Sequence, residues 1–189
     1  DFDRATTQIV DSGVAYDTIR DANGDRVSDL SFLREGFDGF SHFCSGMLVE
    51  PEPFGNRRGT VNRIYFAGEE DGGSSDPVAG AEWALNVRTG VLWQVPAFGR
   101  GAWENVTQID AGSKTHVAFV LSDDTGHFDV DGDGATEAAP LYLYIGEKAP
   151  NGNFLERNGL ADGSLHVWVS DTGETAPSEF GGAGAALCG

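Results

Sequence analysis

Short apolar runs separated by glycine and aspartate make up the hydrophobic pattern of this chain, and no long stretch repeats with the period of a helix. Residues 63–66 alternate weakly, whereas residues 117–121 are apolar throughout, as in a strand that is covered on both faces. Strands are predicted at 61–68, 81–87, 91–97, 115–121, 141–145 and 165–169. The pattern therefore predicts an all-β fold.

The turns predicted between these strands indicate which β architectures the chain can form. The Thr89-Gly90 step suits a tight hairpin between two predicted strands, and residues 110–113 form a second predicted turn. Strands spaced in this way are typical of a sandwich, a barrel or a propeller. Residues 63–96 have the order of most of a propeller blade, namely strand, acidic loop, strand, hairpin and strand. Residues 10–19 fit either a strand or a short helix.

Composition limits the partners of the chain. The 12 Lys and Arg against 30 Asp and Glu give a net charge of −18, which disfavours binding to nucleic acids and to anionic membranes. Each bound calcium ion would remove two charges of self-repulsion, so the acidity suits a cation-binding protein. The acidity fits solubility in salty surroundings equally well. The 27 glycines favour tight turns between strands. No apolar run approaches the roughly 20 residues that span a bilayer.

Two acidic loops have oxygen-bearing side chains at positions one, three, five and nine, with glycine where the chain must turn. They place Asp21, Asn23, Asp25 and Asp29 in the first loop and Asp129, Asp131, Asp133 and Glu137 in the second. Calcium takes six to eight oxygen ligands, which such loops supply in part. Position twelve is Phe32 or Pro140 instead of the glutamate of an EF-hand, so we expect calcium loops of a shorter kind. The alternative is two solvated Asp/Gly turns.

Three further acidic groups fall at the ends of β-runs or in loops. They are Glu69-Glu70-Asp71, Glu104-Asn105 and Ser122-Asp123-Asp124. Acids at strand ends converge on one mouth in many β folds, where they form an oxygen-rich site for calcium, magnesium, manganese or ferric iron. The alternative for each is a solvated loop. The four histidines, His42, His116, His127 and His166, show no zinc-binding spacing.

The two cysteines, Cys44 and Cys188, allow one disulfide that would close a long loop and hold the C-terminal tail. A chain that begins at Asp1 and carries one such pair fits a processed, exported protein, secreted, extracellular or periplasmic. A piece of a longer chain fits equally well.

Several segments taken in order resemble the PhoX-type alkaline phosphatases, a family of secreted bacterial β-propellers, over about residues 40–168. The segments are 42–50, 63–70, 82–93, 104–107, 121–124, 140–148 and 153–168. The resemblance implies a complete or partial propeller over 40–168, within a single β-rich domain (1–189) that has an irregular segment at 1–39 and a small-residue tail at 170–189. It also implies hydrolysis of phosphate esters with calcium and iron. The implied metal ligands are Cys44, Glu69 or Glu70, Glu104, and Asp123 or Asp124.

Three departures from that family bear on activity. Members of the family are generally longer, the residues after Cys44 lack a Trp-rich acidic segment, and arginines that could clamp a phosphate are scarce between 101 and 157. The preferred hypothesis is an extracellular calcium-binding, propeller-like protein with a structural, binding or assembly role, including self-assembly through an edge strand. The alternative is a phosphomonoesterase that uses Ca²⁺ and Fe³⁺. Cys44 separates the two, because the enzyme needs it on a metal and the structural protein pairs it with Cys188.

Overall fold

The computed structural model describes residues 2–28, 40, 42–70, 80–124, 134 and 139–168. Strands dominate these residues, which include a single short α-helix, α1 (Phe154–Arg157), and one 3₁₀ turn, η2 (Pro96–Phe98). The predicted all-β fold is therefore confirmed for the described part of the chain. The tail at 170–189 lies outside the described residues.

A five-stranded sheet has the order β3-β7-β6-β5-β4. Its strands are β3 (Thr18–Arg20), β4 (Met47–Val49), β5 (Ile64–Gly68), β6 (Glu82–Asn86) and β7 (Val91–Gln94). Strands β4 to β7 follow one another as an antiparallel meander, and β3 adds to β7 in parallel. The strand within the ambiguous N-terminal segment is thus the edge of this sheet.

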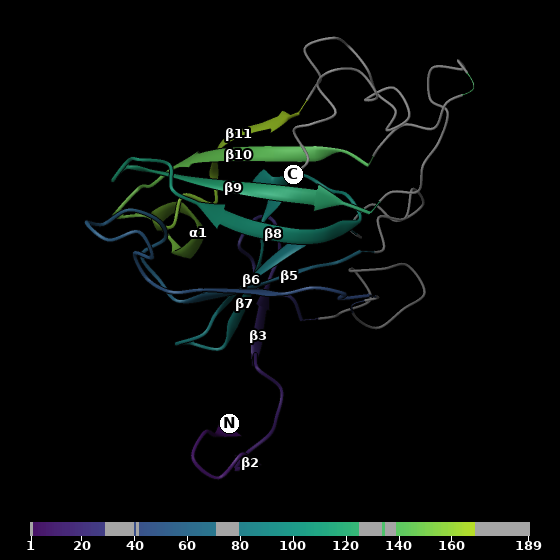
Figure 1. Ribbon diagram of the computed structural model, residues 1–189, viewed down its shortest axis with the longest axis vertical. Helices are drawn as coiled ribbons and strands as arrows, with labels where there is room; N and C mark the ends of the chain where they lie inside the picture. The colour runs from purple at the N-terminus through teal and green to yellow at the C-terminus, as the bar shows by residue number, and fades with distance from the viewer. Residues whose placement is uncertain are drawn as a thin grey trace, which may run out of the picture.

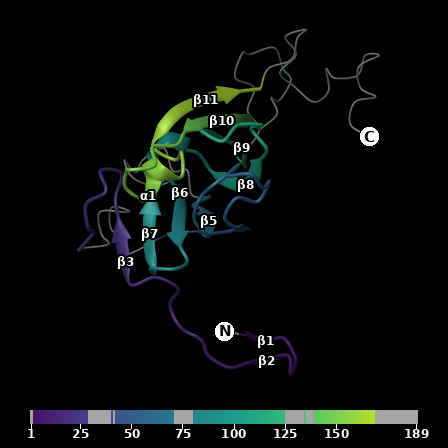
Figure 2. The same ribbon diagram turned by 90° about the vertical axis from the view of Figure 1, so that its left-hand side faces the viewer.

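A four-stranded antiparallel sheet has the order β11-β10-β9-β8. Its strands are β8 (Trp103–Ile109), β9 (His116–Asp123), β10 (Leu141–Glu147) and β11 (Asp162–Val167). Figure 1 shows this sheet lying over the five-stranded one, with α1 beside it. A separate hairpin of β1 (Phe2–Asp3) and β2 (Gln8–Ile9) lies apart from both sheets, as Figure 2 shows from the side.

The main hydrophobic core fills the space between the two sheets. Alternation along β5 buries Ile64 and Phe66 completely, while Tyr65 between them is 42% exposed. Phe119 and Tyr144 of the facing sheet are also fully buried in this core. Strand β6 is buried on both faces, because Ala84 faces this core and Trp83 faces a second cluster on the other side of the sheet. Burial of each large apolar side chain contributes roughly 1.5–3 kcal/mol.

The predicted strands and turns can be compared with those observed. All six predicted strands overlap observed ones, and the hairpin closes with the Gly90 amide donating to the Asn86 carbonyl over 3.0 Å. The turn at 110–113 has the Gly112 amide donating to Asp110 Oδ1 over 2.9 Å. The strand predicted at 91–97 ends earlier, at Gln94, because Pro96 begins the turn η2 and has no N–H for a ladder. Strand β8 was not predicted.

Among the described residues, no helix is both long enough and apolar enough to cross a membrane.

Candidate metal centre

Five side chains of metal-binding type gather at one end of the two sheets, and we call them the sheet-end cluster. They are His42, Cys44, Glu70, Glu104 and Asp124. They form two overlapping groups, one of His42, Cys44 and Glu70 and the other of Glu70, Glu104 and Asp124. Within each group the potential ligand atoms lie within 4.8 Å of one another. Glu70 belongs to both groups, so a single carboxylate joins them.

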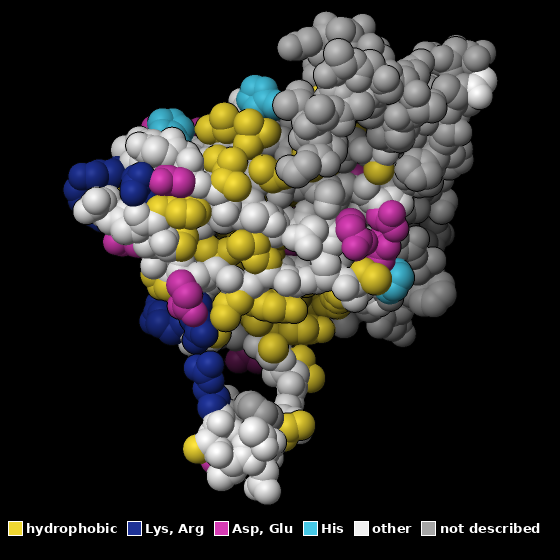
Figure 3. Space-filling view, in the orientation of Figure 1, with side chains coloured by type: hydrophobic (Ala, Val, Ile, Leu, Met, Phe, Trp, Pro, Cys, Tyr) yellow, Lys and Arg dark blue, Asp and Glu magenta, His cyan; other side chains and the backbone are white. Residues whose placement is uncertain are grey.

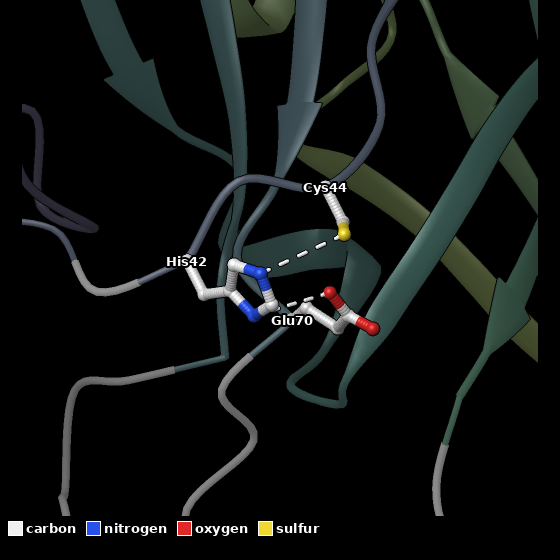
Figure 4. A group of neighbouring side chains, drawn as sticks. All are labelled: His42, Cys44 and Glu70. Carbon is white, nitrogen blue, oxygen red and sulfur yellow. Dashed lines mark hydrogen bonds and ion pairs between the residues drawn. The ribbon is translucent and has the colours of Figure 1, made fainter.

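Backbone pairing brings the first group together. The segment that leads into β4 runs beside the end of β5, where Phe43 bridges to Glu69 and the Glu70 amide donates to the His42 carbonyl over 2.9 Å. Side chains two residues apart on an extended segment point the same way, so His42 and Cys44 both face the Glu70 carboxylate. Figure 4 shows the three side chains converging from these two segments.

The four-stranded sheet supplies the other two carboxylates. Asp124 follows the end of β9, and its amide donates to the Ala102 carbonyl over 2.8 Å. Glu104 lies in β8 at a register shift between Trp103 and Asn105. Such a bulge redirects the side chain next to it, which is why bulges are common beside functional sites. Figure 3 shows acidic side chains gathered beside a histidine at this edge of the molecule.

The contacts inside the first group are polar. Cys44 Sγ lies 3.7 Å from His42 Nε2, and His42 Nδ1 lies 3.3 Å from Glu70 Oε2. The His42 side chain is 62% exposed and that of Glu70 is 15% exposed. The group is therefore open to solvent on the histidine side, and an ion could enter there.

The titration of the cluster reflects its negative charge. A hydrogen bond to Glu70 raises the pKa of the Cys44 thiol, as do partial removal from water and the charges of Glu70, Glu104 and Asp124. The hydrogen bond from Cys44 lowers the pKa of Glu70, and a hydrogen bond with Asp124 and the charge of His42 lower it further. Without a cation, the thiol is therefore a proton donor to a carboxylate. A metal ion would replace that proton and bind both groups.

The two groups differ in chemistry. Imidazole and thiolate ligands suit transition metals, whereas a set made only of carboxylates suits hard cations such as calcium, magnesium or manganese. Three carboxylates held this close repel one another, and a cation between them removes the repulsion.

Successive side chains of an extended segment point to opposite sides, so only one residue of each neighbouring acidic pair can join the sheet-end cluster. Of Glu69 and Glu70, only Glu70 enters the cluster, because Glu69 points to the opposite side and is fully buried. Of Asp123 and Asp124, only Asp124 enters it, and Asp123 is buried with 8% exposure. The predicted convergence of Cys44 and acids from three segments is thus present in the geometry. Whether these residues bind metal stays a prediction.

The thiol of Cys44 is exposed and forms no disulfide with any described residue. Its predicted partner Cys188 lies outside the described residues. Both predicted roles of Cys44, as a metal ligand and as the disulfide partner of Cys188, therefore stay predictions.

The first predicted calcium loop is a compact turn after β3. Asp21 Oδ1 accepts hydrogen bonds from the amides of Asn23 and Asp25, each over 2.9 Å. Arg20 closes the turn by donating to the Gly24 carbonyl over 2.6 Å, and its guanidinium lies 5.0 Å from the centre of the Trp93 ring. These bonds hold the turn without an ion, as the alternative of an Asp/Gly turn requires. Calcium at this loop stays a prediction.

The remaining calcium-loop residues lie outside the described part of the chain. They are Asp29 of the first loop and Asp129, Asp131, Asp133 and Glu137 of the second. In the second loop only Gly134 is described, and its φ of +91° is the left-handed conformation predicted for a turning glycine.

Sequence reasoning missed two functional candidates. The histidines show no zinc-binding spacing, so His42 was not singled out from the sequence. The signal that could have found it is the run His42-Phe43-Cys44. His42 and Cys44 are two residues apart, which places both on one side of an extended segment. Glu82 is fully buried in β6, and a glutamate within an apolar run was the signal that could have found it.

Comparison with protein families, with curated proteins and with solved structures found no match to this chain.

Proposed function

We propose that the protein is a metal-binding β-protein whose ion site is the sheet-end cluster. The observation that carries the proposal is the position of Glu70, whose carboxylate belongs to two ligand groups at once. Ligands from both sheets meet there, so a bound ion would tie the end of β5 to the ends of β8 and β9. Binding to the folded chain alone would stabilise it by mass action.

The chemistry of each group assigns a class of ion. Glu70, Glu104 and Asp124 supply oxygen ligands for calcium. His42, Cys44 and Glu70 supply nitrogen, sulfur and oxygen ligands for a transition metal such as iron. In this proposal, the Glu70 carboxylate would be shared between the two ligand groups.

The strand order supports a propeller-like architecture for this protein. Strands β4 to β7 form one four-stranded antiparallel meander and β8 to β11 form the next. Four-stranded sheets of this kind are the blades of propellers, which place ligands at the strand ends. Extracellular calcium modules bind with dissociation constants of about 10⁻⁴–10⁻³ M. A partly exposed site fits that range, and we therefore propose a secreted or periplasmic location and a structural, binding or assembly role.

The second candidate is a phosphomonoesterase of the PhoX type that uses calcium and iron. The observation that favours it is the mixed ligand group of His42, Cys44 and Glu70 beside an all-carboxylate group. Adjacent ions of this kind polarise a phosphoryl oxygen and activate an attacking nucleophile. A phosphate ester would be the substrate in that case.

Metal loading of the full chain tests the proposal. The protein is stripped with a chelator and reloaded with Ca²⁺ and Fe³⁺, and bound metal is measured by elemental analysis alongside hydrolysis of p-nitrophenyl phosphate. We expect calcium in the wild type and in Cys44→Ser, with iron lost from Cys44→Ser alone. Iron-dependent hydrolysis would select the phosphatase. Calcium binding without hydrolysis would select the structural protein, and no bound metal would refute both.

A further inference from the structure

The hairpin of β1 and β2 projects from the molecule and belongs to neither large sheet. Among the described strands these two pair only with each other, and residues 4–15 are exposed throughout. Ile9 and Val14 are 74% and 78% exposed, more than any other large apolar side chain that the structure describes. Asp3 closes the turn, because its Oδ1 accepts a hydrogen bond from the Ala5 amide over 2.8 Å. An isolated two-stranded hairpin is at best marginally stable in water, so this one needs a surface on which to pack.

Strand β11 forms an edge of the four-stranded sheet that can accept a further strand. One side of β11 pairs with β10, and no described strand pairs with its other side. Leu165 and Val167 lie opposite Tyr144 and Tyr142 on the core-facing side of the sheet, yet they are 37% and 52% exposed. The apolar surface of this sheet thus continues past the part that the five-stranded sheet covers. Such an edge binds an added strand through backbone hydrogen bonds, and the apolar side chains beside it provide packing.

The charge of the chain limits where two copies can meet. Each copy has a net charge of −18, so most of its surface repels a second copy. Residues 2–10 contain one acidic residue, Asp3, and one basic residue, Arg4, and residues 163–167 contain no acidic residue. The hairpin and the β11 edge are therefore surfaces at which a second copy meets little repulsion.

The hairpin and β11 of one copy lie on opposite sides of the five-stranded sheet. Figures 1 and 2 both show the hairpin beyond β3, with β11 at the other end of the molecule. The Asp17 amide donates to the Gly90 carbonyl over 2.9 Å, and this bond fixes the point at which the N-terminal segment leaves the five-stranded sheet. The hairpin that fits the β11 edge is therefore that of a second copy.

We propose that the hairpin of β1 and β2 docks on the β11 edge of a second copy of this chain and extends its four-stranded sheet. Ile9 then packs beside Leu165 and Val167 of that copy. Reciprocal exchange of the two hairpins gives a symmetric dimer with two identical contacts. The contact uses no residue of the sheet-end cluster and is independent of the proposed metal centre.

Sedimentation equilibrium of the full chain, with a chelator present, tests this exchange. Ile9→Glu places a charge on the hairpin and Val167→Glu places one on the β11 edge, and each should shift the wild-type dimer to a monomer. Leu48→Glu is the matched control, because Leu48 is an exposed apolar residue of β4 outside both surfaces, and this variant should stay dimeric. All three side chains are exposed, so the far-UV circular dichroism of each variant should match that of the wild type.

Mixing the two variants tests whether the hairpin and the edge contact each other. Ile9→Glu keeps an intact β11 edge and Val167→Glu keeps an intact hairpin, so the mixture should recover a dimer with one contact, weaker than that of the wild type. A monomeric wild type, a dimer that persists in either variant, or a mixture that stays monomeric would overturn the exchange.

Discussion

His42 and Glu70 are joined twice, by a hydrogen bond of 2.9 Å from the Glu70 amide to the His42 carbonyl and by a contact of 3.3 Å between His42 Nδ1 and Glu70 Oε2. The backbone hydrogen bond fixes the distance between the two segments. The side-chain contact orients the Glu70 carboxylate towards His42 and Cys44. The backbone bond does not depend on the side chain, so Glu70→Gln should keep the fold while removing a ligand.

Glu70→Gln should weaken binding of calcium and of a transition metal together, because its carboxylate belongs to both ligand groups. Glu104→Gln should weaken calcium binding alone. Titration calorimetry with each ion, on the metal-free full chain, measures both effects. If Glu70→Gln weakened the binding of only one ion, Glu70 would not be shared between the groups.

The raised pKa of the Cys44 thiol predicts slow alkylation in the metal-free protein. Thiolate is the reactive form, so a higher pKa leaves less of it at a given pH. Glu70→Gln removes the charge and replaces the carboxylate acceptor with a weaker amide acceptor, so the pKa of the Cys44 thiol should fall. Alkylation by iodoacetamide at pH 8 should therefore become faster. A rate that is unchanged or slower in Glu70→Gln would contradict this account of the thiol.

Burial raises the pKa of Glu82 well above the ordinary glutamate value of about 4.3. The folded chain therefore binds this proton more tightly than the unfolded chain does. The resulting stability is fully present below the unfolded pKa and is lost as pH rises towards the folded pKa, at about 1.4 kcal/mol per pH unit. Urea unfolding of the metal-free wild type should show this loss, and Glu82→Gln should not. The exposed Glu147→Gln serves as the matched control.

Much of the fold could be predicted from the sequence, because runs such as 117–121 pack in the core and glycine stands where the hairpins turn. Strand β8 could not be predicted from the sequence, because the bulge between Trp103 and Asn105 breaks the alternation of buried and exposed residues by which a strand is recognised. The convergence of acids at strand ends was predictable in kind. The sequence could not show that Glu70, and not Glu69, joins the cluster, because this depends on which face of β5 meets the other sheet.

Helix α1 was missed although its capping box is visible in the sequence. Asn153 Oδ1 accepts from the Glu156 amide over 3.1 Å, and the Asn153 amide donates to Glu156 Oε2 over 2.6 Å. Asn153→Ala should lower the free energy of unfolding by about 1 kcal/mol, as loss of an N-cap typically does. Asn151→Ala, in the exposed turn before the helix, should change it little. Equal urea midpoints for the two variants would show that the cap contributes nothing.

Alanine variants of Gly159 and Gly112 distinguish the cost of backbone strain at positive φ from the cost of steric overlap with neighbouring atoms. Both have positive φ, +72° and +66°, but a Cβ on Gly159 would lie 2.7 Å from Val117 Cγ2, whereas one on Gly112 would meet nothing within 4 Å. Each alanine variant should lose about 1 kcal/mol to backbone strain, and Gly159→Ala should lose a further 1–3 kcal/mol to overpacking. Thermal unfolding measures both, and equal losses would contradict the packing around Gly159.

The most direct test of the metal centre is elemental analysis of wild type and Glu70→Gln, purified side by side and dialysed against the same calcium- and iron-containing buffer. The account predicts bound metal in the wild type and a clear loss in Glu70→Gln. A wild type that holds no more metal than Glu70→Gln would contradict it.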